Sequence, residues 1–318
     1  MAITRPNILT DPVTRKKYAQ GVKLLKAEVT GPTTTSLGIA GPAQRVSTYD
    51  LFVVWHHTAM STFTPPSQGD RNAAHRGPVF CPWHRFMLRQ LELNLQRVLG
   101  DANFGLPYWD WAADGQKTPS QQTLSKVWAA DAMGGSGSPV TTGPFAFNAS
   151  DPATFRVRIE ANVNGQLVQT NHGLRRAIGV QAPRLPNKAD TAGAVAMAPY
   201  DAPPWDTSSA GLRNRLEGWA APAAPALHNR VHVWVGGDML PSSSPNDPVF
   251  FMNHCNVDRI WEAWLTRHGR TYLPPQTAPA SLKGHRINDA MASLVSAPMK
   301  PSDVLDMKSV YVYDSLVV

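Results

Sequence analysis

Apolar residues recur with helical periodicity along several stretches of this sequence. The clearest stretch is residues 83–99, where Leu88, Leu91 and Leu95 fall on one face of a helix. Gly100 follows them as a stop signal. The same spacing predicts further helices at residues 11–28, 46–57, 211–219, 226–235 and 247–267.

Cap signals support two of these helices. Ser47 or Thr48 is a suitable N-cap for the helix at 46–57. Asp247 is a suitable N-cap for the last helix, because Pro248 would then occupy its first position, where a missing N–H costs nothing. Both signals therefore predict where these helices begin.

The remaining chain is predicted to be mostly loop. Residues 58–82 and 115–205 are rich in proline and glycine, with only fragments of helical pattern. Alternation around an Asn-Gly pair predicts a small hairpin at 155–167, and alternation in the tail predicts a strand within 309–318.

Composition supports a mainly α protein with long loops. The chain has 318 residues, of which 42% are hydrophobic and 17% charged, and its 28 prolines exceed the usual share of about 5%. We find no repeat, no low-complexity block and no interdomain linker. We therefore expect one domain over residues 1–318, with a four-helix bundle at its core, long loops and a few short strands.

Charge and hydropathy exclude several classes of partner. The net charge is +7, but the densest basic run is Arg15-Lys16-Lys17, which is too short for a nucleic-acid footprint. No apolar run approaches the roughly 18–20 residues that a membrane-spanning helix needs. The first residues lack the apolar stretch of a secretory signal, so we expect a cytoplasmic location for the chain as written.

Histidines carry the candidate chemistry. His228 and His232 are four residues apart and share one face of the predicted helix at 226–235. His254 lies in the next predicted helix, and facing helices of a bundle commonly assemble a metal site. These three imidazoles form one candidate set of nitrogen ligands.

The first half of the chain offers a second set. His84 opens the strongest helix, His75 lies in the loop before it, and either His56 or His57 ends the preceding helix. A single histidine is more often a surface or satisfied core residue than a ligand. Two clusters among tryptophans and phenylalanines are harder to explain without a metal, because buried imidazoles without partners are costly.

The ligand chemistry favours copper. All candidate ligands are neutral nitrogens, which suit copper, zinc, iron or nickel rather than magnesium or calcium. Neither cluster brings the bridging carboxylates of hydrolytic dizinc centres. Two sites of three imidazoles therefore favour a copper pair that takes up dioxygen.

The segments that carry these histidines resemble the copper motifs of the tyrosinases and catechol oxidases, the type 3 copper phenol oxidases. The resemblance extends from about Tyr49 to Tyr313. It rests on NAAHRGPVFCPWHRFMLRQLE at 72–92, LHNRVHVWVGGDM at 227–239, SPNDPVFFMNHCNVDRIWEAW at 244–264, LPYWDW at 106–111 and YDAPPW at 200–205.

The resemblance implies a ligand set for two copper ions, with dioxygen as co-substrate. Adjacent helical residues point about 100° apart, so His56 and His57 cannot both serve, and the family pattern selects His56. The implied ligands of the first copper are His56, His75 and His84, and those of the second are His228, His232 and His254.

Three further residues match functional positions of the family. Glu217 matches the acid that holds a water near the coppers, and Asn229 matches a position linked to hydroxylase activity. An Asn–Glu pair that orients a water could deprotonate an incoming phenol as a general base. Their ordinary alternatives are a surface amide and a helix carboxylate. Phe250 matches the aromatic residue that lies over the copper pair. Asp258 is expected to anchor the structure with an arginine.

The chain also departs from relatives. Asn253 stands before His254 where many tyrosinases have a second histidine, which alters the surroundings of that ligand. Ala73 occupies the position of a thioether-forming cysteine, so no thioether is expected, and Cys81 and Cys255 are expected to be small apolar fillers.

The loop at 238–247 is expected to border the substrate entrance, with Pro241 and Ser242–Ser244 influencing substrate choice. We expect no covering lid after the Tyr-x-Tyr pattern at 311–313. We therefore expect a chain that is made active, or one that depends on a small copper-delivering partner, with which it could also be exported.

The leading function is that of a tyrosinase, which hydroxylates monophenols and oxidises o-diphenols to o-quinones. The alternative is an o-aminophenol oxidase, or an arylamine- or phenol-modifying relative in secondary metabolism with little or no monophenol hydroxylation. The same six ligands would serve a small phenolic or an o-aminophenolic substrate. A haemocyanin-type dioxygen carrier is disfavoured because such carriers are large assemblies, and metal content would eliminate a structural zinc protein.

Overall fold

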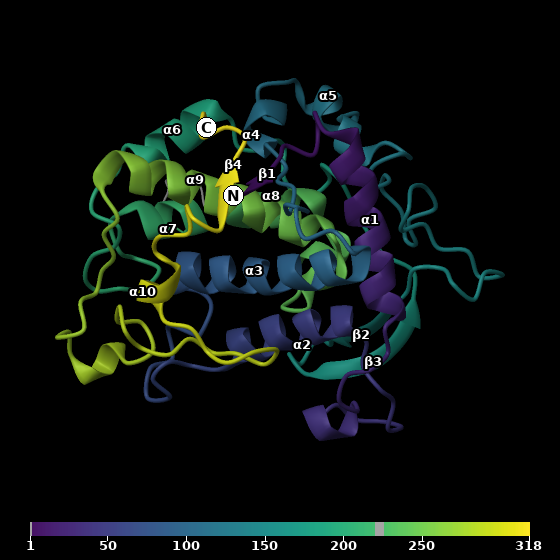
Figure 1. The fold of residues 1–318 in the computed structure, drawn as a ribbon, viewed down its shortest axis with the longest axis horizontal. Helices are drawn as coiled ribbons and strands as arrows, with labels where there is room; N and C mark the ends of the chain where they lie inside the picture. Colours follow the sequence, from purple (N-terminus) through teal and green to yellow (C-terminus); the bar gives the residue numbers. More distant parts are fainter. Residues whose placement is uncertain (1, 220–225) are drawn as a thin grey trace.

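The computed structural model describes residues 2–219 and 226–318, and it is mainly helical, as predicted (Figure 1). Five helices build the centre: α1 (Pro12–Ala27), α2 (Thr48–Ser61), α3 (Phe80–Leu99), α8 (Leu227–Val235) and α9 (Val249–His268). Shorter helices lie around them: α4 (Trp111–Asp114), α5 (Pro119–Thr123), α6 (Lys188–Val195), α7 (Leu212–Glu217) and α10 (Pro301–Val304). Among the residues described, no helix combines the length and apolarity that crossing a bilayer requires.

Four of these helices, α2, α3, α8 and α9, form the expected four-helix core. In Figure 1, α3 runs across the middle of the molecule, with α2 on one side and α8 and α9 on the other. Helix α3 packs on α9, α9 packs on α8, and α1 closes one end by packing on α2 and α3. The long connections wrap around this core.

Several boundaries differ from the predictions by a few residues. Helix α3 begins at Phe80 instead of Trp83, because Pro82 falls in the first turn, where its missing N–H is not needed. Helix α2 continues to Ser61 instead of ending at residue 57. The predicted cap Ser47 is confirmed, since its Oγ accepts from the backbone N–H of Asp50 at 3.0 Å.

The predicted start of the last helix is one residue too early. Helix α9 begins at Val249, and Pro248 occupies the N-cap position. The Asp247 carboxylate still accepts from the Val249 N–H at 2.9 Å, but it also forms a buried ion pair with Arg176 at 2.6 Å. This ion pair fixes the Asp247 carboxylate beside the first turn of α9.

The strands form two small sheets. A hairpin is present as β2 (Val157–Ala161) and β3 (Leu167–His172), but its second strand only begins at residue 167, where the predicted hairpin ended. The tail strand β4 (Tyr311–Tyr313) pairs in parallel with β1 (Ile3–Arg5), so the two ends of the chain lie side by side (Figure 1).

A buried ion network lies where β1, α3 and α9 meet. The Asp258 carboxylate accepts from Arg85 Nε at 2.5 Å and from Arg5 Nη1 at 3.1 Å, and all three side chains are buried. The expectation that Asp258 anchors the structure with an arginine is therefore confirmed. Arg5 also reaches the buried Glu92 carboxylate at 2.9 Å, which ties the first strand to α3.

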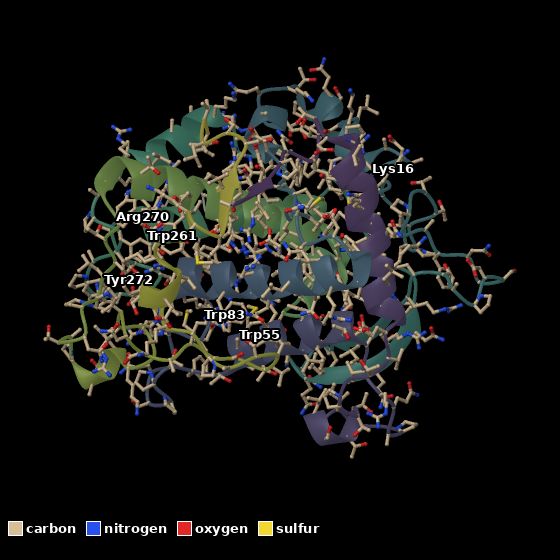
Figure 2. All side chains as sticks on the ribbon, viewed as in Figure 1. Lys16, Trp55, Trp83, Trp261, Arg270 and Tyr272 are labelled. Carbon is tan, nitrogen blue, oxygen red and sulfur yellow. The ribbon has the colours of Figure 1, made fainter. Side chains whose placement is uncertain are left out.

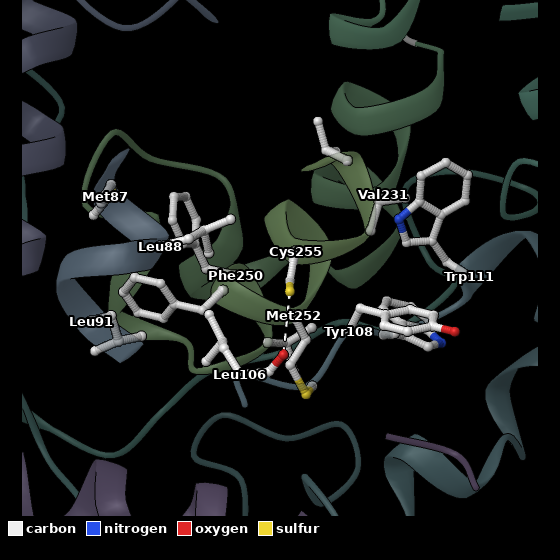
Figure 3. Close-up of a cluster of buried hydrophobic side chains, with 14 of the residues drawn as sticks. Met87, Leu88, Leu91, Leu106, Tyr108, Trp111, Val231, Phe250, Met252 and Cys255 are labelled. Atoms are coloured by element: carbon white, nitrogen blue, oxygen red, sulfur yellow. Dashed lines mark hydrogen bonds between the residues drawn. The ribbon is translucent and has the colours of Figure 1, made fainter. Parts of the chain in front are cut away.

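Aromatic packing fills the interior around these helices. The rings of Trp55 on α2 and Trp83 on α3 lie 5.3 Å apart, and both indole N–H groups donate to the carbonyl of Ala292 (Figure 2). The Ala292 carbonyl thus attaches the loop that contains it to both α2 and α3. Cys255 packs in an apolar cluster and its thiol donates to the Leu106 carbonyl at 3.4 Å (Figure 3).

Candidate metal centre

Six histidines converge in the core as two groups of three. His56 on α2, His75 in the loop before α3 and His84 on α3 form the first group. His228 and His232 on α8 and His254 on α9 form the second. Within each group the potential ligand nitrogens lie within 4.8 Å of one another, so each group could hold a metal ion. The helix spacing that the sequence analysis used brings the i and i+4 pair together on α8.

Backbone carbonyls orient the imidazoles of the first group. His56 Nδ1 lies 2.7 Å from the Ser242 carbonyl oxygen, and His84 Nδ1 lies 2.8 Å from that of Phe80. Since a carbonyl only accepts, each Nδ1 carries the proton and each Nε2 presents a lone pair. Both Nε2 atoms are buried and have no hydrogen-bond partner among the described residues.

In the second group the Nε2 atoms also face one another, at short distances. His254 Nε2 lies 3.1 Å from His228 Nε2 and 3.4 Å from His232 Nε2. His232 Nδ1 donates to the Met239 carbonyl at 2.7 Å, so its Nε2 also presents a lone pair. His228 Nε2 and His232 Nε2 direct lone pairs toward His254 Nε2, so either a proton on His254 Nε2 or a cation between the three nitrogens must stabilise this arrangement. The donor set therefore fits a metal ion that prefers neutral nitrogen ligands.

Burial keeps these imidazoles neutral. It lowers the pKa of His56 to about 3 and that of His232 to about 4, against partly opposing hydrogen bonds to carbonyls. The pKa values of the other four are also lowered well below the ordinary value by burial. Neutral imidazoles are the form that binds metals, so all six are ready as ligands near pH 7.

The two groups are in direct contact and form one centre. The ring of His84 in the first group stacks on that of His254 in the second, with centroids 4.1 Å apart and planes inclined by 12°. The rings of His75 and His228 lie 6.0 Å apart. Two ions held by these groups would therefore be neighbours.

His57 lies outside both groups. Its Nδ1 lies 2.8 Å from the Ser242 hydroxyl oxygen, and its Nε2 lies 3.4 Å from that of Ser61. The neighbouring His56 points into the first group, as adjacent positions on a helix require. The Ser242 residue thus contacts both histidines, one through its carbonyl and one through its hydroxyl.

Phe250 packs against the imidazoles of both groups. Its ring centroid lies 4.1 Å from that of His254 and 4.8 Å from that of His56, and the side chain is completely buried. This contact restricts how far either ring can rotate. Phe250 is not among the described residues that line the pocket above the centre.

An open pocket of about 270 Å³ leads to the histidines. The loop after α8 borders it, as expected, through Leu240, Pro241 and Ser244. Ser242 instead serves the histidines, and the Ser243 hydroxyl accepts from the backbone N–H of Ala161 at 2.9 Å. Only part of the predicted specificity segment therefore faces the pocket.

Glu217 and Asn229 lie beside His228. The Glu217 carboxylate is buried, with Oε1 accepting from the Arg76 N–H at 2.7 Å and Oε2 from Arg213 Nη1 at 3.2 Å. Burial raises the pKa of this carboxyl despite the nearby guanidinium of Arg213. The Asn229 side chain lines the pocket, and its Oδ1 lies 3.0 Å from His228 Nδ1.

Sequence reasoning missed several members of the site. Arg213 lies four residues before Glu217 on α7, and this i,i+4 charge pattern is a signal that could have revealed the pair. Arg76 also lines the pocket and follows His75 directly. The carbonyls of Ser242 and Met239 have no side-chain signature, so no sequence pattern could have revealed them.

The predicted departures have structural counterparts. Asn253 is completely buried, and neither polar atom of its amide has a partner among the described residues. Cys81 and Cys255 are both free and buried, in agreement with a role as small apolar fillers. Ala73 is also buried, close to His75 in the chain.

Comparison with known proteins gives consistent relatives. The chain is 39% identical to a tyrosinase of Streptomyces glaucescens over 86% of this chain and 90% of the relative. It is 42% identical to a tyrosinase of Streptomyces antibioticus, over 74% and 80% of the two chains. It is 36% identical to grixazone synthase of Streptomyces griseus, over 85% and 91%.

Solved structures share the fold. A polyphenol oxidase of Thermothelomyces thermophila matches with a TM-score of 0.68 at 21% identity, over 98% of this chain and 88% of that one. A functional unit of octopus hemocyanin matches with a TM-score of 0.56 at 19% identity, over 99% and 69%.

The family profile described as the common central domain of tyrosinase matches residues 46–267, a span that includes the six histidines of the two groups. With the named relatives, this match shows that the chain belongs to the tyrosinase family, the type 3 dicopper phenol oxidases.

Proposed function

We propose that this chain is a tyrosinase that hydroxylates monophenols and oxidises o-diphenols to o-quinones. In this proposal His56, His75 and His84 hold one copper ion. His228, His232 and His254 hold the other. The observation that carries the proposal is the convergence of six neutral imidazoles, five of them buried and that of His232 half-buried, beneath an open pocket. When bound, the copper pair supplies activation of dioxygen and acceptance of electrons from the phenol.

The pocket walls suit a phenolic ring. Met60, Trp219, Val233, Leu240 and Pro241 supply apolar surface around the approach to the histidines. A flat aromatic ring can lie between such walls with its hydroxyl toward the imidazoles, because burying the ring is favourable and leaving the hydroxyl unpartnered is not.

Asn229 and Glu217 are proposed to assist removal of the phenolic proton. The Asn229 Oδ1 faces His228 Nδ1, and the contacts of the described residues show no acceptor for its amide N–H groups, which could therefore orient a water from the pocket wall. Glu217 is next to the same ligand through its backbone, since its backbone carbonyl oxygen lies 3.2 Å from His228 Nδ1. A water held between these groups would accept the phenolic proton as a general base.

Initial rates on three matched substrates test this function: a monophenol, its o-diphenol and its o-aminophenol analogue. A tyrosinase converts the monophenol, with or without a lag. Replacing Asn229 by Ala or Glu217 by Gln should then reduce monophenol turnover more than diphenol turnover. Equal losses on both substrates would contradict the proton-transfer role and favour a structural one.

The second candidate is an o-aminophenol oxidase with little or no monophenol hydroxylation. It is favoured by the 36% identity to a relative named grixazone synthase, over most of both chains. The same substrate panel separates the two functions, because turnover confined to the o-aminophenol and o-diphenol would support this candidate and contradict the first.

The ligand assignment is tested by metal content. Replacing His232 by Ala should leave one copper per chain and abolish oxidation, because the second site would lose a third of its ligands. A variant that keeps two coppers and full activity would contradict the assignment.

We further propose that residues 1–318 act as one catalytic domain, since one cluster of buried apolar side chains includes members from Ile8 to Tyr313.

We also propose that a small copper-delivering partner docks at the pocket mouth, and that the chain resides in the cytoplasm unless such a partner exports it. Leu240 and Trp219 support docking, because they are 45% and 36% exposed beside the pocket. Two unpaired cysteines are common in a reducing compartment. Full loading of the metal-free protein by copper salts alone would contradict the need for a partner, and fractionation of cells tests the location.

A further inference from the structure

The pocket above the histidines carries one charged side chain among its described lining residues. Arg76 is that residue, and the other lining side chains are apolar, uncharged polar or neutral imidazole. No acidic side chain lines the pocket in the described part of the chain. The pocket therefore presents an isolated positive charge to any molecule that enters it.

The backbone holds Arg76 in an unusual conformation. Its φ is +62°, in the left-handed region that non-glycine residues rarely adopt at a cost of roughly 1 kcal/mol. The N–H of Arg76 donates to Glu217 Oε1 at 2.7 Å, which keeps the residue in this conformation. The position of the side chain at the pocket is therefore specified by a buried carboxylate.

The guanidinium lies over the ring of Trp219, 5.4 Å from its centroid. It forms no ion pair with any carboxylate of residues 2–219 and 226–318. The remaining residues, 1 and 220–225, contain no Asp or Glu. The hydrogen bonds of the described residues include none from this guanidinium, so its planar fork of five N–H donors can reach a ligand at an exposed edge of the pocket.

When a phenol enters the pocket with its hydroxyl first, the guanidinium of Arg76 lies near the other end of the molecule. A phenol whose hydroxyl faces the imidazoles directs its para substituent toward the mouth of the pocket. The exposed side chains of Arg76, Trp219 and Leu240 line the pocket there. A carboxylate on that substituent can accept two parallel N–H bonds from a guanidinium.

We infer that the enzyme prefers phenols whose para substituent ends in a carboxylate, and that Arg76 is the residue that selects them. This inference rests on the proposed phenol oxidation. Glu217 has a second role in it, because its carboxylate positions the backbone of the selecting residue. A cationic substituent, such as an ammonium group, is disfavoured by the same guanidinium.

The test compares three o-diphenols that differ in the charge of the substituent: 3-(3,4-dihydroxyphenyl)propionate, neutral 4-methylcatechol and cationic dopamine. Diphenols are used because both candidate functions oxidise them. We expect kcat/KM to follow the order anionic, neutral, cationic. In Arg76→Gln the anionic-to-neutral ratio of kcat/KM should fall roughly tenfold, as for loss of a charge-assisted hydrogen-bonded pair.

Two variants serve as controls. Arg76→Lys keeps the charge and should retain part of the preference, which a merely structural role of the side chain would not predict. Arg184→Gln removes the same charge from an exposed residue that does not line the pocket, and it should leave the ratio unchanged.

A binding measurement complements turnover. The copper-loaded protein is titrated calorimetrically with 3-phenylpropionate and with 3-phenylpropionamide, neither of which can be oxidised as a phenol. Weaker binding of the acid but not the amide in Arg76→Gln supports the inference. Equal affinities for the acid in both proteins would overturn it, as would a kcat/KM ratio unaffected by Arg76→Gln. Lack of turnover with all three diphenols would instead contradict the proposed function.

Discussion

Replacing Asp258 by Asn should destabilise the protein strongly, because this carboxylate neutralises two buried arginines. It accepts from Arg85 Nε at 2.5 Å and from Arg5 Nη1 at 3.1 Å, and the hydroxyls of Tyr311 and Tyr313 also donate to it. Burial alone would raise the pKa of Asp258, but the two guanidinium groups outweigh it and lower this pKa. The carboxylate is therefore charged in the folded protein.

The structure bounds the loss of stability. Removing one partner of a buried ion pair costs about 3–5 kcal/mol, since it leaves an uncompensated charge in the interior. Arg5 would retain Glu92 at 2.9 Å and Arg85 would retain Glu262 at 3.0 Å. Because each arginine keeps one carboxylate, we expect the lower end of that range, about 3 kcal/mol.

Urea unfolding of the metal-free protein at pH 7, followed by tryptophan fluorescence and circular dichroism, measures this loss. Asp101→Asn is the matched control, because its partner Lys17 lies 2.7 Å away with 44% of its side chain exposed. Such a surface pair contributes about 1 kcal/mol or less. A loss below about 1 kcal/mol in Asp258→Asn would refute the reasoning, since Glu92 and Glu262 alone would then suffice.

Three other changes give distinct outcomes. His56→Gln should leave one copper per chain and His57→Gln should leave two, by atomic absorption; equal contents would contradict the choice between them. The metal-free protein should lose stability as pH falls below about 6.5, the unfolded-state pKa of histidine. The folded-state pKa values of His56 and His232, about 3 and about 4, mean that the unfolded chain binds more protons there. A urea midpoint that is unchanged between pH 7 and pH 5 would contradict this. Gly105→Ala should destabilise by about 1–3 kcal/mol, because its Cβ would lie 1.9 Å from the Thr4 carbonyl oxygen. Gly193→Ala in α6 meets nothing within 4 Å and should stabilise by up to about 1 kcal/mol, so a thermal melt that ranks the two glycine variants the other way would refute the packing argument.

Local patterns made the helices and the histidine groups predictable. The i,i+4 spacing of His228 and His232 is a property of one helix, so the sequence alone places these two imidazoles together. The choice between His56 and His57 came from the family pattern, because both lie on the same helix. In the structure the difference lies in tertiary contacts, since Ser242 presents its carbonyl to one and its hydroxyl to the other.

The pairing of the chain ends could not be predicted in the same way. Strands β1 and β4 are three residues each, and Ile3 pairs with Tyr311 across almost the whole sequence. Alternation predicted a strand in the tail, but β1 is too short to show a period, and neither strand's pattern specifies its partner. The burial of Arg5 follows from that pairing, and an arginine near a chain end has no sequence feature that marks it as a core residue.

The orientation of the histidine side chains depends on backbone carbonyls of the loop at 238–247 as much as on the helices. The carbonyls of Ser242 and Met239 fix the Nδ1 protons of His56 and His232, one histidine in each group. Pro241 lies between them in the chain and lines the pocket. A change that reshapes this loop for another substrate therefore also moves the groups that orient two ligands. It follows that substrate specificity and copper affinity should change together in this loop, whereas a change at Arg76 should alter specificity without altering copper affinity.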